Sequence, residues 1–179
     1  YVSNHASTLD IFLAIWLCPM GGCGIGKKEL ARVPFFGWLY KLSGHLLIDR
    51  TDREGAIAAL AETAQVVKRH GMSVWIWPEG TRSRNGHLQK FKKGFAHLAI
   101  ATRLPIRPVV LHGAHRIWPN KSRRLIPGEL RIQVLEAIDT SNWKLETLNE
   151  HIQQVQDRIR AALGDDQAPE DDEGVLALS

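Results

Sequence analysis

The sequence predicts an α/β fold, a layered sandwich in which helices flank a mostly parallel central sheet. Short apolar segments typical of buried strands alternate along the chain with longer segments of helical periodicity. Strands that alternate with helices tend to pair in parallel, because a parallel connection needs a long crossover. With 179 residues, 44% of them hydrophobic, the chain is long enough to form one domain with a sizeable core.

The alternation starts at the first residue, where the sequence is typical of the end of a strand. A helix is expected over residues 7–18, and a glycine-rich strand entry follows at 21–28. Residues 45–49 are short, apolar and flanked by turns, as buried strands are. Residues 53–70 carry apolar side chains at helical spacing and stop before Gly71, which predicts an amphipathic helix.

The rest of the chain is expected to contain strand 73–77, helix 94–102, strand 106–111, strand 130–134 and helix 143–163. Apolar and polar residues alternate over 130–134, so that strand should be half-buried. Residues 1–164 form the domain in this prediction. Residues 165–179 are acidic and poor in aromatic side chains, which predicts a disordered tail.

Residues 33–42 are apolar on nearly every side of the expected helix. A helix on the surface of a soluble protein shows a polar face, so this segment is either buried or in contact with lipid. Trp38 and Tyr40 lie beside Lys41, a combination that suits a membrane interface. The sequence leaves the core and the lipid interpretations open.

The charge is unevenly distributed. The whole chain carries +4, but six acidic residues and no Lys or Arg follow Gly164, which leaves 23 basic against 13 acidic residues in 1–164. A domain with a net charge of +10 expects an anionic partner, either a membrane surface or a phosphorylated substrate. No recognisable nucleic-acid-binding motif accompanies the charge, so nucleic acid is not expected as a partner.

Metal and nucleotide sites are poorly supported. Cys18 and Cys23 have no second pair of ligands, and His112 and His115 have no further ligands nearby in sequence, so no metal site is predicted. Reduced thiols in a cytosolic setting are expected instead. The run Gly21-x4-Gly26-Lys27 is similar to a P-loop but has Lys28 where a P-loop needs Ser or Thr.

His5 and Asp10 are the first candidates for catalysis. A histidine titrates near neutral pH, and a carboxylate can fix its tautomer and stabilise the imidazolium. Five residues of ideal helix rotate by about 500°, which would place the two side chains about 140° apart around the helix. They meet only if His5 lies in the loop before the helix. Ser7 offers that break as an N-cap. The segment from Ser7 to Asp10 also fits a capping box with Asp in place of Glu, so the pair alone leaves both interpretations open.

Three further blocks accompany this pair. Together with the first they read Asn4-His5-x4-Asp10, Gly44-His-Leu-Leu-Ile-Asp49-Arg50, Trp77-Pro78-Glu79-Gly80-Thr81-Arg82-Ser83 (followed by Phe91-Lys92-Lys93-Gly94) and Leu104-Pro105-Ile-Arg-Pro108-Val109. In order and spacing they resemble the glycerolipid acyltransferase superfamily, most closely the lysophosphatidic acid acyltransferases. The resemblance covers about residues 1–113. The family usually has Phe at the position of Trp77.

The resemblance assigns roles to individual residues. It implies that His5 and Asp10 carry acyl transfer. It also implies that the second and third blocks hold the glycerol phosphate of the acceptor, through Arg50, Glu79, Gly80, Thr81 and Arg82. Arginine grips phosphate with two parallel donors, whereas Glu79 is expected to orient an arginine or the acceptor hydroxyl. Gly80 permits a backbone conformation that turns N–H groups toward an anion.

The function implied is transfer of a fatty acyl group from an acyl thioester to the free hydroxyl of lysophosphatidic acid, giving phosphatidic acid in phospholipid biosynthesis. Acyl-CoA or acyl carrier protein would be the co-substrate, with no other cofactor. No G-x-S-x-G motif supplies a covalent nucleophile, so direct transfer is expected. The enzyme would work at the cytoplasmic side of an anionic membrane, either peripheral or anchored by an amino-terminal segment absent from this sequence.

Two alternatives remain. The same pair could serve another acceptor, namely glycerol-3-phosphate, another lysophospholipid or an aminoacyl lipid. The chain could also be a basic, tryptophan-rich module that only docks on anionic membranes.

Overall fold

The computed structural model describes residues 1–179 except 36, 39–41, 43–44, 49–52, 121 and 168–179. Its strands are β1 Val2–Ser3, β2 Gly22–Lys27, β3 Leu46–Ile48, β4 Ser73–Trp75, β5 Pro108–His112 and β6 Arg131–Val134. Its α-helices are α1 Leu9–Leu17, α3 Arg53–His70, α4 Gly94–Thr102, α5 Ala114–Ile117 and α6 Leu148–Leu163, and its 3₁₀ turns are η1 Lys28–Arg32 and η2 Asp165–Gln167.

The strands form two small sheets, in the orders β1-β5-β6 and β3-β2-β4. The pairs β1–β5, β2–β3 and β2–β4 are parallel, and β6 runs antiparallel to β5. A single parallel bridge between Val2 and Ile76 joins the two sheets. The expected α/β class is therefore confirmed. Among the described residues the strands form two small sheets linked by this bridge, and a single central parallel sheet is not shown.

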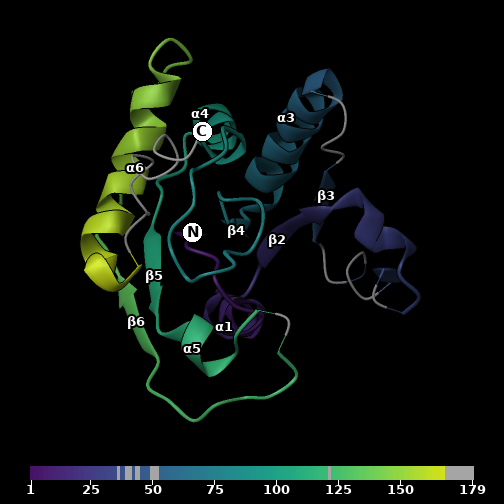
Figure 1. The fold of residues 1–179 in the computed structure, drawn as a ribbon. Coiled ribbons are helices and arrows are strands. Elements are labelled where there is room, and N and C mark those ends of the chain that lie inside the picture. The colour runs from purple at the N-terminus through teal and green to yellow at the C-terminus, as the bar shows by residue number, and fades with distance from the viewer. Residues whose placement is uncertain (36, 39–41, 43–44, 49–52, 121, 168–179) are drawn as a thin grey trace, which may run out of the picture.

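Helices cover both faces of β5 (Figure 1). Val109 and Leu111 pack with Leu13 of α1, whereas Val110 packs in a second cluster with Phe95 of α4 and with α6. This alternation follows from the two-residue period of a strand, and it makes β5 the buried centre of the molecule. A third cluster joins α3 and α4 to β2 and β4.

Two helices have the predicted bounds, Arg53–His70 for α3 and Gly94–Thr102 for α4. The last helix begins at Leu148, five residues later than expected. Trp143 is buried before the helix starts and stacks on His151, with 4.3 Å between ring centroids. Leu145, which the expected helix 143–163 included, is exposed and contributes nothing to the core.

Three other predictions differ from the structure or fall outside it. The fold continues three residues past the expected boundary at Gly164, because Gln167 is buried and its side chain binds the main chain of Gly86 and Gly113. In segment 33–42, Val33, Phe35, Trp38 and Leu42 are all exposed, which is against a core position for these four side chains. Tyr40 and the tail from 168 lie outside the described residues.

Among the residues that the structure describes, no helix has the length and apolar character needed to cross a membrane.

Candidate active site

His5 lies in the loop between β1 and α1, off the helix, as the spacing requires. Its Nδ1 is 2.8 Å from Oδ2 of Asp10, which sits in the first turn of α1. Asp10 is buried, and the His5 side chain is 11% exposed. The sequence prediction that these two side chains meet is confirmed in its geometry.

Asp10 has a structural role beside its contact with His5, although the N-cap of α1 is Thr8 and not the expected Ser7. Its Oδ2 accepts the N–H groups of Ala6 at 2.7 Å and Ser7 at 2.8 Å in addition to the His5 ring. The Ser7 hydroxyl accepts the N–H of Leu9 and donates to the main-chain oxygen of Trp118. Asp10 thus closes the turn that enters α1 and, with the same oxygen, orients the imidazole.

The tautomer of His5 follows from this arrangement. An ionised carboxylate only accepts hydrogen bonds, so Nδ1 must carry the proton that Asp10 accepts. Nε2 then has a free lone pair and is available as a proton acceptor. The ring of Trp77 stacks on the imidazole, with 4.5 Å between centroids and 20° between planes, and limits its rotation.

Glu79 supports the His5 loop from within the protein. Its Oε1 accepts the N–H of His5 at 2.6 Å, and its Oε2 accepts the N–H of Gln89 at 3.0 Å. The N–H of Ser83 in turn donates to the main-chain oxygen of His5 at 2.8 Å. Glu79 is only 2% exposed, so it holds main-chain groups and does not face a phosphate.

Burial raises the pKa of Glu79 to about 8, and the charge of Asp10 acts in the same direction. The hydrogen bonds from His5 and Gln89 lower the pKa of this carboxyl, but burial outweighs them. At neutral pH Glu79 therefore keeps its proton and adds no full negative charge beside the His5–Asp10 pair.

The structure brings one of the expected phosphate-binding arginines to this pair. The Arg82 guanidinium is exposed and donates to the Thr8 hydroxyl, two residues before Asp10. Thr81 is also exposed, and its hydroxyl donates to Oε1 of Gln89 at 3.5 Å. The third block thus lies against the entry to α1, although more than 70 residues separate the two in sequence.

Gly80 differs from the expectation, and Arg50 is not described. Gly80 has the predicted left-handed backbone, with φ at 77°, but its N–H donates to the main-chain oxygen of Trp77. That N–H closes a turn and is not directed toward an anion. Arg50 and Asp49 lie outside the described residues.

Asn4 supports the site in a way that we did not predict from the sequence. Its side chain donates to the main-chain oxygen of Leu111 at 3.0 Å and accepts the N–H of the same residue at 2.9 Å. The residue just before His5 is thereby fixed to β5. The position of Asn4 next to His5 in the first block could have indicated a role in the site. The partner of Asn4 is a main-chain group, however, and a sequence motif does not reveal such a partner.

No group of three or more His, Cys, Asp or Glu side chains is placed to hold a metal ion within the described part of the chain.

A family model described as acyltransferase matches residues 1–112, which include His5, Asp10 and the 79–82 loop. The chain belongs to the acyltransferase family. The family assignment made from the sequence blocks is therefore confirmed.

Several relatives of this acyltransferase chain are named 1-acyl-sn-glycerol-3-phosphate acyltransferase. The protein from Cocos nucifera is 44% identical over 87% of this chain and 50% of its own length. The protein from Escherichia coli is 39% identical over 84% of this chain and 60% of its own length. The chain thus spans about half the length of the curated relatives it matches.

A solved structure has a similar fold. The 1-acyl-sn-glycerophosphate (LPA) acyltransferase PlsC from Thermotoga maritima is 29% identical, with a TM-score of 0.70. The match covers 88% of this acyltransferase chain and 62% of the other.

Proposed function

We propose that the protein transfers a fatty acyl group from an acyl thioester to the free hydroxyl of lysophosphatidic acid, giving phosphatidic acid. The His5–Asp10 pair, held at 2.8 Å with Arg82 beside it, is the observation that carries this proposal. The names of the relatives support the acceptor, since they are acyltransferases for 1-acyl-sn-glycerol-3-phosphate. The donor is acyl-CoA or acyl carrier protein, and the two are equally compatible with this chemistry.

In the proposed reaction, Nε2 of His5 takes the proton of the acceptor hydroxyl. The resulting alkoxide attacks the thioester carbonyl, and the C–S bond breaks as the carbonyl re-forms. The imidazolium, stabilised by Asp10 at Nδ1, returns the proton to the departing thiolate. A positioned base of this kind contributes about 10² to 10⁴ in rate, and the orientation of the substrates contributes more.

The phosphate of the acceptor is assigned to Arg82, with Arg50 as its expected partner from the second block. Arg82 is exposed beside the entry to α1, so a phosphate bound there would place the glycerol hydroxyl close to His5. Thr81 is exposed next to it and completes the proposed contact. Glu79 and Gly80 stabilise this loop through hydrogen bonds to main-chain groups.

The proposal includes a location at the cytoplasmic side of an anionic membrane, because acceptor and product are lipids and residues 1–164 carry +10.

The first test replaces the base. His5→Ala should lower thiol release from acyl-CoA in the presence of lysophosphatidic acid at least about a hundredfold, with little loss of fold. His151→Ala is the matched control, because His151 also stacks on a tryptophan, Trp143, but lies on α6. A folded His5→Ala protein that releases thiol normally would end the proposal.

The second test concerns the acceptor. Arg82→Ala should raise the KM for lysophosphatidic acid about ten- to a hundredfold and leave the KM for acyl-CoA nearly unchanged, because it removes a charge-assisted contact. Arg82→Lys should recover only part of the loss. Arg158→Ala, on the exposed face of α6, is the control. If Arg82→Ala raises the KM for acyl-CoA and not the KM for lysophosphatidic acid, Arg82 binds the phosphates of the coenzyme.

A further inference from the structure

The outer face of α1 is apolar and exposed to solvent. Ile15 is 66% exposed and Trp16 is 76% exposed, and Phe12 and Ile11 are exposed beside them. The only charged residue of this fully described helix, Asp10, is buried in the active site. A helix on the surface of a soluble protein normally turns polar side chains outward, so this face is built for an apolar environment.

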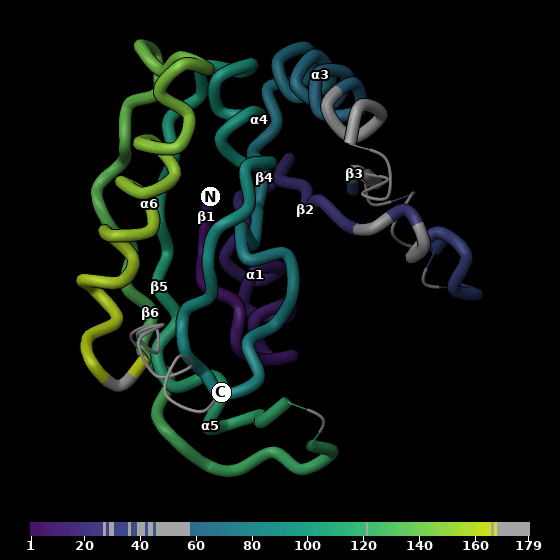
Figure 2. Tube along the Cα trace, turned by 45° about the horizontal axis from the view of Figure 1, so that its top comes forward, coloured from purple at the N-terminus to yellow at the C-terminus, as the bar shows by residue number. Residues whose placement is uncertain are grey.

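The segment that follows α5 extends the same surface. Phe12 stacks on Trp118, with 6.1 Å between centroids, so α1 and α5 lie side by side (Figures 1 and 2). The indole N–H of Trp118 donates to the main-chain oxygen of Ser122, and the N–H of Ile126 donates to that of Ile117. These bonds hold segment 122–126 against α5.

Segment 122–126 combines two cations with two apolar side chains. Arg123, Arg124, Leu125 and Ile126 are all exposed. Exposed arginines next to an apolar helix face form the pattern that binds anionic headgroups and the acyl boundary beneath them. A second protein surface would meet the apolar face but would leave the neighbouring cations without matching charges, whereas an anionic bilayer matches both.

We infer that the exposed face of α1, together with segment 122–126, is the surface through which this protein docks on an anionic lipid bilayer. The inference rests on the membrane location proposed above and names the contact surface, which differs from segment 33–42, for which the sequence left a lipid contact open. Asp10 lies in the first turn of the docked helix, so docking would bring the His5–Asp10 pair to the lipid headgroups. Acceptor and product could then pass between site and bilayer without crossing water.

The experiment measures binding of the 179-residue chain to vesicles by co-sedimentation. Vesicles of phosphatidylcholine with about a third phosphatidylglycerol should bind the wild type at least about tenfold more tightly than vesicles of phosphatidylcholine alone. Ile15→Ser combined with Trp16→Ser should weaken binding at least about tenfold, because two large apolar side chains no longer enter the bilayer. Both are exposed, so thermal unfolding should stay unchanged.

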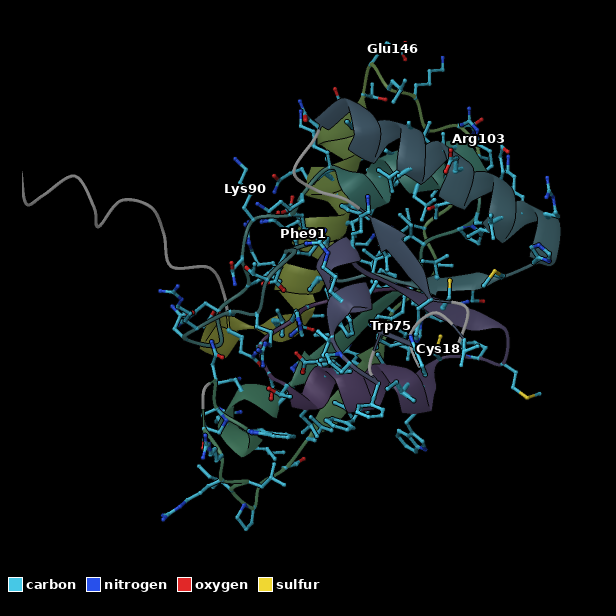
Figure 3. The ribbon with its side chains drawn as sticks, turned by 90° about the vertical axis from the view of Figure 1, so that its right-hand side faces the viewer. Cys18, Trp75, Lys90, Phe91, Arg103 and Glu146 are labelled. Atoms are coloured by element: carbon cyan, nitrogen blue, oxygen red, sulfur yellow. The ribbon has the colours of Figure 1, made fainter. Side chains whose placement is uncertain are left out.

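The charge arm uses Arg123→Glu combined with Arg124→Glu. It should abolish the preference for anionic vesicles. Matched controls lie outside this surface. The first is next to Glu146, which is on the side opposite α1 in Figure 3. Leu145→Ser replaces an exposed apolar residue there, and Lys144→Glu combined with Arg158→Glu reverses two exposed charges. Both controls should bind vesicles as the wild type does.

Lipids with brominated acyl chains provide a positional readout. They should quench tryptophan fluorescence in the wild type and much less in Trp16→Phe, although Trp16→Phe should still bind. Normal binding by the α1 double variant would overturn the inference, and loss of binding in Trp38→Ser would then move the contact to segment 33–42. Concentration-dependent dimers that the α1 variant abolishes, without vesicle binding, would assign this face to a second copy.

Failure of the docking inference can be told apart from failure of the proposed reaction. Thiol release with short-chain substrates in detergent needs no bilayer, so the α1 and arginine variants should keep that activity. A wild type that transfers acyl groups in detergent but ignores anionic vesicles would refute docking and leave the reaction intact.

Discussion

Asp10→Asn separates the two roles of Asp10, because asparagine can keep the turn but cannot supply the charge. Three donors converge on Oδ2, from the His5 ring and from the N–H groups of Ala6 and Ser7, so the amide oxygen should occupy that position. The amide nitrogen then takes the place of Oδ1, which is buried and already without a hydrogen-bond partner. The fold should change little, since the number of unsatisfied groups at this position is unchanged.

The kinetic effect can be estimated from the geometry. An imidazolium and a carboxylate whose charge centres are about 4 Å apart attract each other by about 4 kcal/mol at an effective dielectric constant of 20. A neutral amide oxygen keeps a hydrogen bond of about 1 kcal/mol. The difference of about 3 kcal/mol falls on the transition state, where His5 is protonated, and corresponds to a loss in kcat on the order of a hundredfold.

The assay is thiol release from acyl-CoA with lysophosphatidic acid, together with thermal unfolding of the same preparation. Asp157→Asn is the control, because Asp157 pairs with Arg160 on the surface of α6. A well-folded Asp10→Asn enzyme with a kcat within threefold of wild type would refute the charge argument. A collapse in thermal stability would instead show that Asp10 serves mainly to cap the helix.

Two further predictions concern stability. The folded protein holds the Glu79 proton up to about pH 8, whereas an ordinary Glu releases it at 4.5, so between these values the free energy of unfolding should fall as pH rises, by up to about 1.4 kcal/mol per pH unit. Glu79→Gln should flatten this dependence in urea unfolding at pH 5, 6.5 and 8, and an unchanged slope would assign the titration to another group. Asn4→Ala should lower the free energy of unfolding by roughly 2–4 kcal/mol, because the N–H and C=O of Leu111 lose their buried partners. A loss below 0.5 kcal/mol would show that those groups find other partners.

The elements that the sequence predicted best are those whose limits have a local cause. The predicted limits of α3 and α4 agree with the observed ones because a residue in the left-handed conformation follows each helix, Gly71 after α3 and Arg103 after α4. In α3 a strong apolar stripe also precedes Gly71. The start of α6 was missed because Trp143, which the expected helix 143–163 included, is buried in the loop before the helix and stacks on His151. Tertiary packing decided that boundary, and periodicity alone does not contain it.

The candidate site shows the same division. His5 and Asp10 could be paired from the sequence because their contact is local and its geometry allows few solutions. The role of Glu79 could not be predicted. Its carboxyl oxygens accept the main-chain N–H groups of His5 and Gln89, and the residue types do not indicate such contacts. Raising its pKa required the burial that only the folded chain provides.

The hydrogen bonds made by the main chain of His5 also explain why the first and third sequence blocks act together. The N–H of His5 donates to Glu79, and its carbonyl oxygen accepts from Ser83, so the loop that bears the base and the loop that bears Arg82 are bonded at two points. Arg82 adds a third link through Thr8. A movement of the 79–83 loop would therefore displace the imidazole as well as the arginine. Binding of a phosphate by Arg82 would fix the loop and, through these bonds, fix the base in its working position.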